Sequence, residues 1–212
     1  MMPGPTHLRE PCEIAAPQFE ALYEASDDPW RFDGSWYEAR KRRLLLASLP
    51  HERYARAFEP GCATGLLTAE LAARCDSVLA TDGADRALAI AARRLRPHHP
   101  HVSLARMWVP DEWPEGTFDL IVLSEFVYYL APEAIDRLAQ RVLGALAPDG
   151  VVAACHWRPP IAGCALAGDA VHERLAQQWA LHPALQTADA DFRLDVWTAG
   201  ARSVAGIERR GD

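Results

Sequence analysis

The sequence is poor in positive charge and has almost no lysine. Its 212 residues include 22 lysines and arginines against 29 aspartates and glutamates, a formal net charge of −7. Lys41 is the only lysine, which by itself indicates a compositional preference for arginine and no particular function. The two short basic clusters, at residues 40–43 and 93–96, are too small to make the chain attractive to a polyanion. We therefore expect no nucleic-acid partner.

Cysteine pairs and long apolar runs are also missing. The five cysteines form no CxxC pair, so the sequence predicts neither a disulfide framework nor a metal site. No apolar run comes near the roughly 20 residues that a membrane-spanning helix needs, and the first residues do not resemble a secretion signal. These absences favour a cytoplasmic protein without membrane contact. The cysteines are Cys12, Cys62, Cys75, Cys155 and Cys164.

From about residue 55 onward, short apolar runs alternate with helical periodicity, which is typical of βα units around a parallel sheet. We expect a Rossmann-like α/β fold with seven strands, mostly parallel, the last strand antiparallel and helices on both faces. No helix fits between the last two strands, so they should pair at one edge. The predicted strands are residues 54–59, 78–82, 102–106, 118–124, 151–157, 192–197 and 203–207. The predicted helices are residues 66–75, 85–95, 132–146 and 168–179.

The first 50 residues differ from the rest. They contain Trp30 and Trp36 of the 7 tryptophans and two helix candidates, at residues 18–24 and 37–49. We interpret residues 1–50 as an N-terminal helical cap on the core of residues 51–212, within a single domain.

The run EPGCATG, residues 59–65, stands where the first predicted strand turns into the first helix. In an open α/β sheet, ligands usually bind at this turn. Gly61 and Gly65 remove Cβ atoms that would keep a ligand away from the backbone. A dinucleotide site requires GxGxxG, but Ala63 and Leu66 stand where the second and third glycines would be. Phosphate binding is therefore poorly supported.

The same run resembles the first motif, roughly ExGxGxG, of the class I S-adenosylmethionine-dependent methyltransferases. Asp82 ends the second strand, 82 − 65 = 17 residues after Gly65, and residues 118–130 resemble the strand-four motif of that family. Several stretches together are similar to the subgroup related to rhizobial nodulation protein S, an N-methyltransferase acting on the amino group of a chitooligosaccharide. They are PWRFDGSWYEARKRRLLLASLP, FEPGCATG, LSEFVYYL, HWRPP and GDAVHERL.

The resemblance implies S-adenosylmethionine as cofactor, S-adenosylhomocysteine as product and a small-molecule substrate, with an amine favoured over a hydroxyl. It implies that Asp82 binds the ribose hydroxyls, and that Glu59 either approaches the cofactor's amino group or orders the loop. Trp30 and Arg40 become candidates for the cofactor's carboxylate end. If Ala63 adopts a positive φ, its Cβ costs about 1 kcal/mol or more. The predicted cofactor-binding residues are Trp30, Arg40, Glu59, Gly61, Cys62, Gly65, Asp82, Gly83, Met107, Trp108 and Ser124.

The catalytic candidates are Glu125, Tyr128 and His156. Glu125 falls at the carboxyl end of strand four, beside the expected methyl group. His156 ends strand five and could help to deprotonate an amine, although a histidine in such a place is more often structural. One of Tyr128 and Tyr129 should pack and the other face the pocket.

Two other functions fit parts of the pattern. A nicotinamide-dependent oxidoreductase shares this kind of sheet but is disfavoured by Leu66 and Glu59. A non-catalytic protein that binds S-adenosylmethionine is the second alternative, for which Ala63 in the glycine run is the feature to watch.

Overall fold

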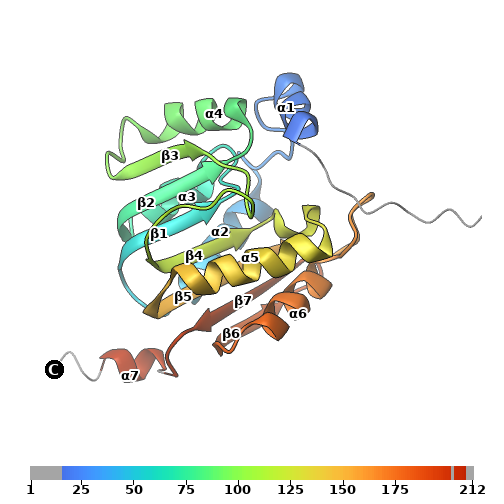
Figure 1. The fold of residues 1–212 in the computed structure, drawn as a ribbon. Coiled ribbons are helices and arrows are strands. Elements are labelled where there is room, and N and C mark those ends of the chain that lie inside the picture. Colours follow the sequence, from blue (N-terminus) through green and yellow to red (C-terminus); the bar gives the residue numbers. More distant parts are fainter. Residues whose placement is uncertain (1–15, 202, 209–212) are drawn as a thin grey trace, which may run out of the picture.

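A computed structural model describes residues 16–201 and 203–208, whose strands form one sheet of seven (Figure 1). The order across the sheet is β3-β2-β1-β4-β5-β7-β6. Strands β1 to β5 are parallel, whereas β7 runs antiparallel to both β5 and β6. The predicted fold class is confirmed. The strands are β1 (Tyr54–Pro60), β2 (Cys75–Asp82), β3 (Val102–Arg106), β4 (Phe118–Ser124), β5 (Leu146–Trp157), β6 (His182–Ala188) and β7 (Phe192–Thr198).

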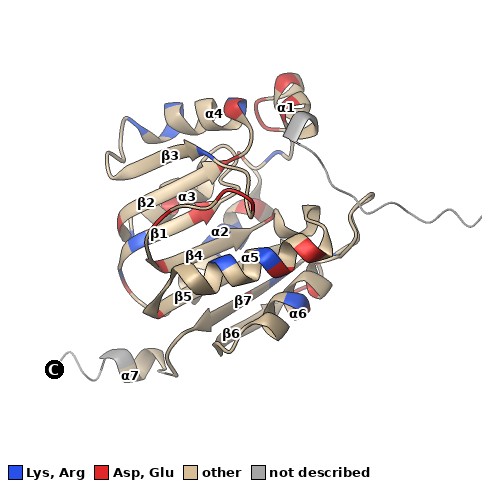
Figure 2. Cartoon of the chain, viewed as in Figure 1, with Lys and Arg blue, Asp and Glu red and all other residues tan. Residues whose placement is uncertain are grey.

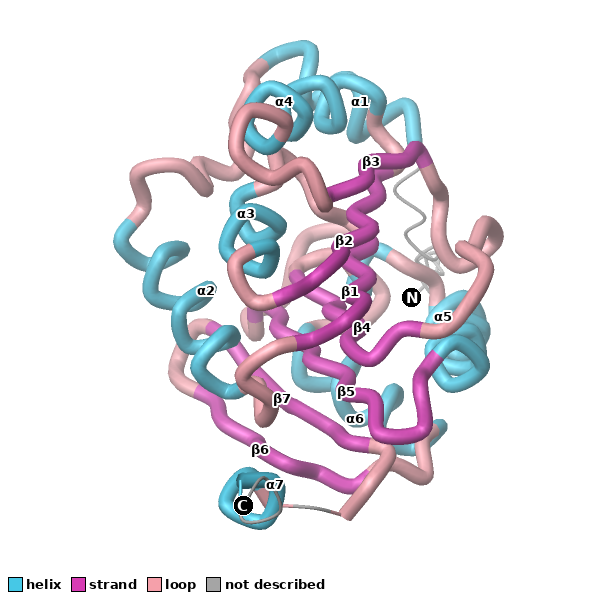
Figure 3. Tube along the Cα trace, turned by 90° about the vertical axis from the view of Figure 1, so that its left-hand side faces the viewer, coloured by secondary structure: helices cyan, strands magenta, loops and turns pink. Residues whose placement is uncertain are grey.

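Helices cover both faces of the sheet, with α2 and α3 on one side and α5 on the other (Figure 3). The helix α4 packs beside α3 and against β2 and β3, and α6 packs on α5, β5 and β7. The helices are α1 (Ala16–Ala25), α2 (Trp36–Ser48), α3 (Leu66–Ala72), α4 (Asp85–Leu95), α5 (Pro132–Ala145), α6 (Gly168–Gln178) and α7 (Val204–Glu208), with a short 3-10 helix, η1 (Val127–Tyr129).

The central strand β4 joins two apolar cores. Leu120 and Val122 belong to the core shared with α2 and α3, while Ile121 and Leu123 belong to the core shared with α5 and α6. All four side chains are fully buried. A strand buried on both faces reads as a continuous apolar run, which is why FDLIVLS was readily predicted.

The C-terminal edge differs from the prediction. Residues 204–208 form the helix α7, so the strand expected at residues 203–207 was wrong. The partner of β7 is instead β6, every residue of which is exposed. Backbone pairing with β7 holds β6 in place, and no buried apolar face marks it in the sequence.

The described part of the cap contains both predicted helices. The Ser35 hydroxyl caps α2 by accepting a hydrogen bond from the Glu38 N–H, and Leu45 and Leu49 pack in the same core as the α3 leucines. Tyr23 of α1 packs in a third cluster with Ala87 and Ile90 of α4. The cap is therefore attached to the sheet domain through two separate apolar contacts.

The surface mixes charges of both signs. The helices α4 and α5 each carry acidic and basic residues (Figure 2), so neither presents a surface of a single charge. None of the helices that the structure describes is both long and apolar enough to cross a membrane.

The central strand gives a test of the fold. We expect Ile121→Ala to lower the free energy of unfolding by about 3 kcal/mol, because it leaves a cavity at a fully buried position. Leu143→Ala on α5 is the matched control, since Leu143 is 38% exposed. Urea denaturation of both variants measures the difference, and equal losses would contradict the placement of β4 between two cores.

Candidate functional site

A cavity of about 850 Å³ lies at the carboxyl ends of β1, β2 and β4, where Gly61, Asp82 and Ser124 line it. Its other walls come from the cap and from the segments that follow β3, β4 and β5. This is the edge at which open α/β sheets bind their ligands.

The loop after β1 has three residues with left-handed backbone, Gly61 (φ +71°), Ala63 (φ +50°) and Gly65 (φ +76°). A Cβ on Gly61 would lie 3.1 Å from the Phe126 ring, so glycine is needed there for space as well as for conformation. Ala63 adopts the positive φ that was considered from the sequence, and this conformation costs about 1 kcal/mol. Hydrogen bonding from the next strand stabilises this conformation.

Asp82 is the residue that supplies this hydrogen bonding. Its Oδ2 accepts from the Ala63 N–H at 2.9 Å and its Oδ1 from the Ala84 N–H at 2.9 Å. Burial raises the pKa of Asp82, and the hydrogen bonds from the backbone oppose that rise. One carboxylate therefore connects the loops after β1 and β2 and still faces the cavity.

An aromatic surface stands beside Asp82. The Trp108 ring lies directly on Gly83, since a Cβ on Gly83 would fall 1.9 Å from the ring. Phe19 of α1 contacts both Trp108 and Tyr129, with ring centroids 6.1 and 5.2 Å apart. Together with Met107, these rings enclose an apolar slot next to a carboxylate.

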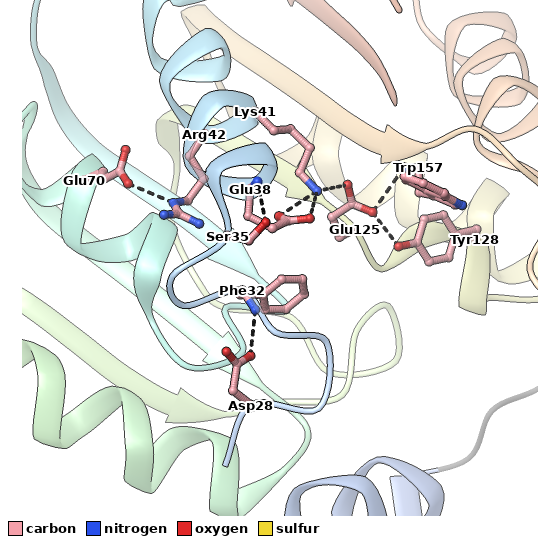
Figure 4. A network of polar contacts seen from close by, with 10 residues as sticks. All are labelled: Asp28, Phe32, Ser35, Glu38, Lys41, Arg42, Glu70, Glu125, Tyr128 and Trp157. Carbon is pink, nitrogen blue, oxygen red and sulfur yellow. Dashed lines mark hydrogen bonds and ion pairs between the residues drawn. The ribbon is translucent and has the colours of Figure 1, made fainter. Parts of the chain in front are cut away.

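A cluster of charged residues, drawn in Figure 4, also lines the cavity. Lys41 of α2 donates to Glu125 Oε1 at 2.7 Å and to Glu38 Oε1 at 3.0 Å, and its Nζ lies 2.8 Å from Glu38 Oε2 in an ion pair. Glu125 Oε2 accepts from the Tyr128 hydroxyl at 2.6 Å and from the Trp157 N–H at 3.1 Å. Glu125 has a left-handed backbone, φ +60°, which these contacts hold in place.

Burial alone would lower the pKa of Lys41, but the Glu125 and Glu38 carboxylates outweigh it and raise the pKa above its usual value. Lys41 is therefore a permanent ammonium at neutral pH, although it is only 4% exposed.

The comparisons with known proteins agree on one family. A family model described as Nodulation protein S (NodS) matches residues 20–173. The chain belongs to the nodulation protein S family. It is 38% identical over 128 residues to nodulation protein S of Rhizobium tropici, covering 59% of this chain and 53% of that protein. It is 34% identical to nodulation protein S of Sinorhizobium fredii, covering 59% of each. The matched region thus spans little more than half the length of these curated relatives.

Solved structures of similar proteins share the fold. The N-methyltransferase NodS of Bradyrhizobium japonicum WM9, crystallised with S-adenosyl-L-homocysteine, superposes with a TM-score of 0.77 at 26% identity, covering 86% of this chain and 97% of that one. A candidate methyltransferase from Pseudomonas syringae superposes with a TM-score of 0.70 at 45% identity, covering 77% and 99%.

Most of the residues predicted for this member of the nodulation protein S family meet in the cavity. Tyr128 and Tyr129 both line it, so the expected division between them is wrong. Five predicted residues do not line it: Arg40, Glu59, Cys62, Gly65 and His156. Those that line it are Trp30, Gly61, Asp82, Gly83, Met107, Trp108, Ser124, Glu125 and Tyr128.

Arg40 lies outside the cavity because of the rotation of α2. Its guanidinium pairs with Asp189 at 2.7 Å, and Lys41 faces the cavity in its place. The prediction missed both Glu38 and Lys41. Their spacing of three residues puts them on one helix face, and the rarity of lysine was the signal that could have singled out Lys41.

His156 lies behind the cavity wall, fully buried. Its Nε2 accepts from the Val127 N–H at 3.4 Å, so its proton lies on Nδ1 and points to His172 Nε2 at 3.0 Å. His172 in turn donates from Nδ1 to Asp195 at 2.9 Å. Burial holds the pKa of His156 well below its usual range. Both ring nitrogens of this neutral histidine are hydrogen-bonded, and one of them holds the backbone of η1 in place. Because the ring does not line the cavity, it cannot contact a substrate amine there.

The loop after β1 also contains residues that act from behind the cavity. Cys62 is 4% exposed and Gly65 packs against Ala91 and Leu95 of α4. Glu59 is 3% exposed, and its Oε2 has no hydrogen-bond partner among the described residues. Burial raises the pKa of Glu59 to about 8, so it is largely neutral at pH 7. Glu59 does not line the cavity, and its two predicted roles, contact with the cofactor's amino group and ordering of the loop, stay predictions.

Glu59 predicts a pH dependence of stability. Its carboxyl ionises near pH 4.5 in the unfolded chain and near pH 8 in the folded one, so ionisation opposes folding between these values. Relative to Glu59→Gln, the free energy of unfolding of the wild type should fall by about 1.4 kcal/mol per pH unit from about pH 5 and level off above about pH 8. Urea denaturation at a series of pH values measures the difference. Glu115→Gln, at an exposed position, should show no such trend, and a constant offset for Glu59→Gln would contradict the assignment.

Proposed function

We propose that this protein is an S-adenosylmethionine-dependent methyltransferase that acts on an amine of a small molecule. The observation that carries the proposal is the position of Asp82, a half-buried carboxylate that faces the cavity between the glycine-containing loop and the Trp108 ring. Ribose hydroxyls would donate to Asp82, the adenine would lie against Trp108 and Met107, and the methionine part would follow Gly61 and Ala63.

The charge of the cavity supports a sulfonium cofactor. A lining with more carboxylates than cations attracts a positive ligand and disfavours a pyrophosphate. The lining contains four carboxylates, those of Asp33, Glu38, Asp82 and Glu125, and two cations, Arg31 and Lys41. The excess of carboxylates and the absence of a GxGxxG pattern both disfavour the alternative of a nicotinamide-dependent oxidoreductase.

The similarity to an N-methyltransferase crystallised with S-adenosyl-L-homocysteine supports the same proposal. Since the matched region covers 53% of the Rhizobium tropici protein, the substrate of that family is carried over only as a class, an amine on a small molecule.

The cofactor, when bound, supplies a methyl group that is already activated as a sulfonium. The residues of this chain then have to orient the acceptor and keep water away, which accounts for most of the rate in such reactions. The cap supplies the apolar rings of Phe19, Trp30 and Phe32, which cover the cavity. Glu125 and Tyr128 remain the predicted residues at the reacting end.

Calorimetric titration with S-adenosylhomocysteine tests the proposal. The wild type should bind, and Asp82→Asn should weaken the dissociation constant by about tenfold to one hundredfold, because the ribose loses a charge-assisted acceptor. Asp76→Asn is the matched control, since Asp76 lies at the other end of β2 and pairs only with Arg53 on the surface. Absence of binding to the wild type, or equal affinity of the Asp82 variant, would refute the proposal. Binding without methyl transfer to any amine would favour the non-catalytic alternative.

A further inference from the structure

The only lysine of the chain is also one of its most buried charged residues. All other side chains of that charge class are arginines, yet the position between Glu38 and Glu125 holds a lysine that is 4% exposed. An ammonium group can direct three N–H bonds to two carboxylates around a single point, which a planar guanidinium cannot do. The preference of the chain for arginine therefore does not explain Lys41. The two carboxylates around it require a compact cation.

The two carboxylates of the cluster, Glu38 and Glu125, differ in the number of donors that bind them. Glu125 accepts three hydrogen bonds, one from Lys41 on Oε1 and two from the Tyr128 hydroxyl and the Trp157 N–H on Oε2. Glu38 accepts only from Lys41, among the residues that the structure describes. A carboxylate offers about four acceptor positions, so Glu38 retains open ones.

The net charge of the cluster is negative and favours a positively charged ligand. Two carboxylates and one ammonium leave a net charge of −1 in a part of the cavity whose walls are aromatic. The Tyr37 ring lies beside Lys41, 5.1 Å from Nζ to the ring centroid, and packs edge-on against Trp157. The Glu38 side chain is 14% exposed, so solvent screens its charge poorly. Aromatic rings around an unsatisfied carboxylate are a favourable site for a second ammonium.

We propose that Glu38 is a catalytic residue that binds the substrate amine in its ammonium form and accepts its proton. In this step one N–H bond of the ammonium breaks, its electron pair stays on nitrogen, and the proton moves to a Glu38 carboxylate oxygen. The nitrogen thereby becomes a neutral nucleophile inside the cavity. Glu125, the candidate from the sequence, serves instead to hold Lys41, Tyr128 and the strained backbone. The inference rests on the proposed function and specifies which residue recognises the substrate.

Two probes that differ only in the group of interest test this role. Benzylamine carries an ammonium where benzyl alcohol carries a hydroxyl, and each is titrated by NMR at about pH 7 into the full chain saturated with S-adenosylhomocysteine. The wild type should bind benzylamine about tenfold more tightly than benzyl alcohol, because a charge-assisted hydrogen bond in a poorly screened site is strong. Glu38→Gln should abolish the preference and leave the affinity for S-adenosylhomocysteine within about twofold.

Matched variants separate the possible outcomes. Glu52→Gln, at an exposed position outside the cavity, should retain the preference, and Glu38→Asp should retain part of it. A wild type that does not distinguish the probes, or does not bind them, overturns the proposal without the need for any variant. A Glu38→Gln protein that keeps the preference overturns it too. If Glu38→Gln instead weakens S-adenosylhomocysteine binding by about tenfold, Glu38 serves the cofactor and the proposal is wrong. A wild type that binds no S-adenosylhomocysteine contradicts the proposed function itself, and the first titration reveals this.

Discussion

The pair of hydrogen bonds from the Ala63 and Ala84 N–H groups to Asp82 determines the shape of the cavity. The loops after β1 and β2 come from separate crossovers, and nothing in a parallel sheet requires them to lie at one particular distance. A carboxylate that is largely removed from water needs donors, and these two backbone groups supply them. These two hydrogen bonds hold both loops close to the Asp82 carboxylate and keep Ala63 in its left-handed conformation.

A similar need for a partner, at Lys41 and Glu125, attaches the cap to the core. Lys41 belongs to α2 and Glu125 follows β4, 84 residues later in the chain, and their contact is partly buried. Neither charge is stable there alone, because the free energy needed to remove an ion from water is larger than the free energy gained from a weak contact. The position of α2 over the sheet is therefore set by electrostatic pairing as well as by the apolar contacts of Leu45 and Leu49.

Patterns of burial explain which elements could be predicted from the sequence. The strands β1, β2, β4 and β5 and the helices α4 and α5 bury apolar side chains, and β3 packs Val102 and Leu104 partly buried against the core, so an apolar pattern marks each of these elements in the sequence. Strand β6 buries no side chain and is held by backbone pairing alone, which leaves no mark in the sequence. His156 shares a strand face with Val152 and Ala154, which point into the core beneath α6, so strand alternation carries it away from the cavity.

The choice between Arg40 and Lys41 depended on the rotation of one helix. Neighbouring helical residues point about 100° apart, so an error of one position moves a side chain off the site. Leu45 lies four residues after Lys41 and is buried against the sheet. Residues at this spacing share a face, so the apolar stripe of α2 contained the information that selects Lys41.

A chain with one lysine has one peptide bond that a lysine-specific protease can cut, and here that bond lies within the helix α2 beneath the cavity. Proteases need an extended stretch of several residues, so the native molecule resists such an enzyme until α2 lifts away and unwinds. Cleavage by that enzyme thus reports the unfolding of α2, alone or with the rest of the domain, at a single site.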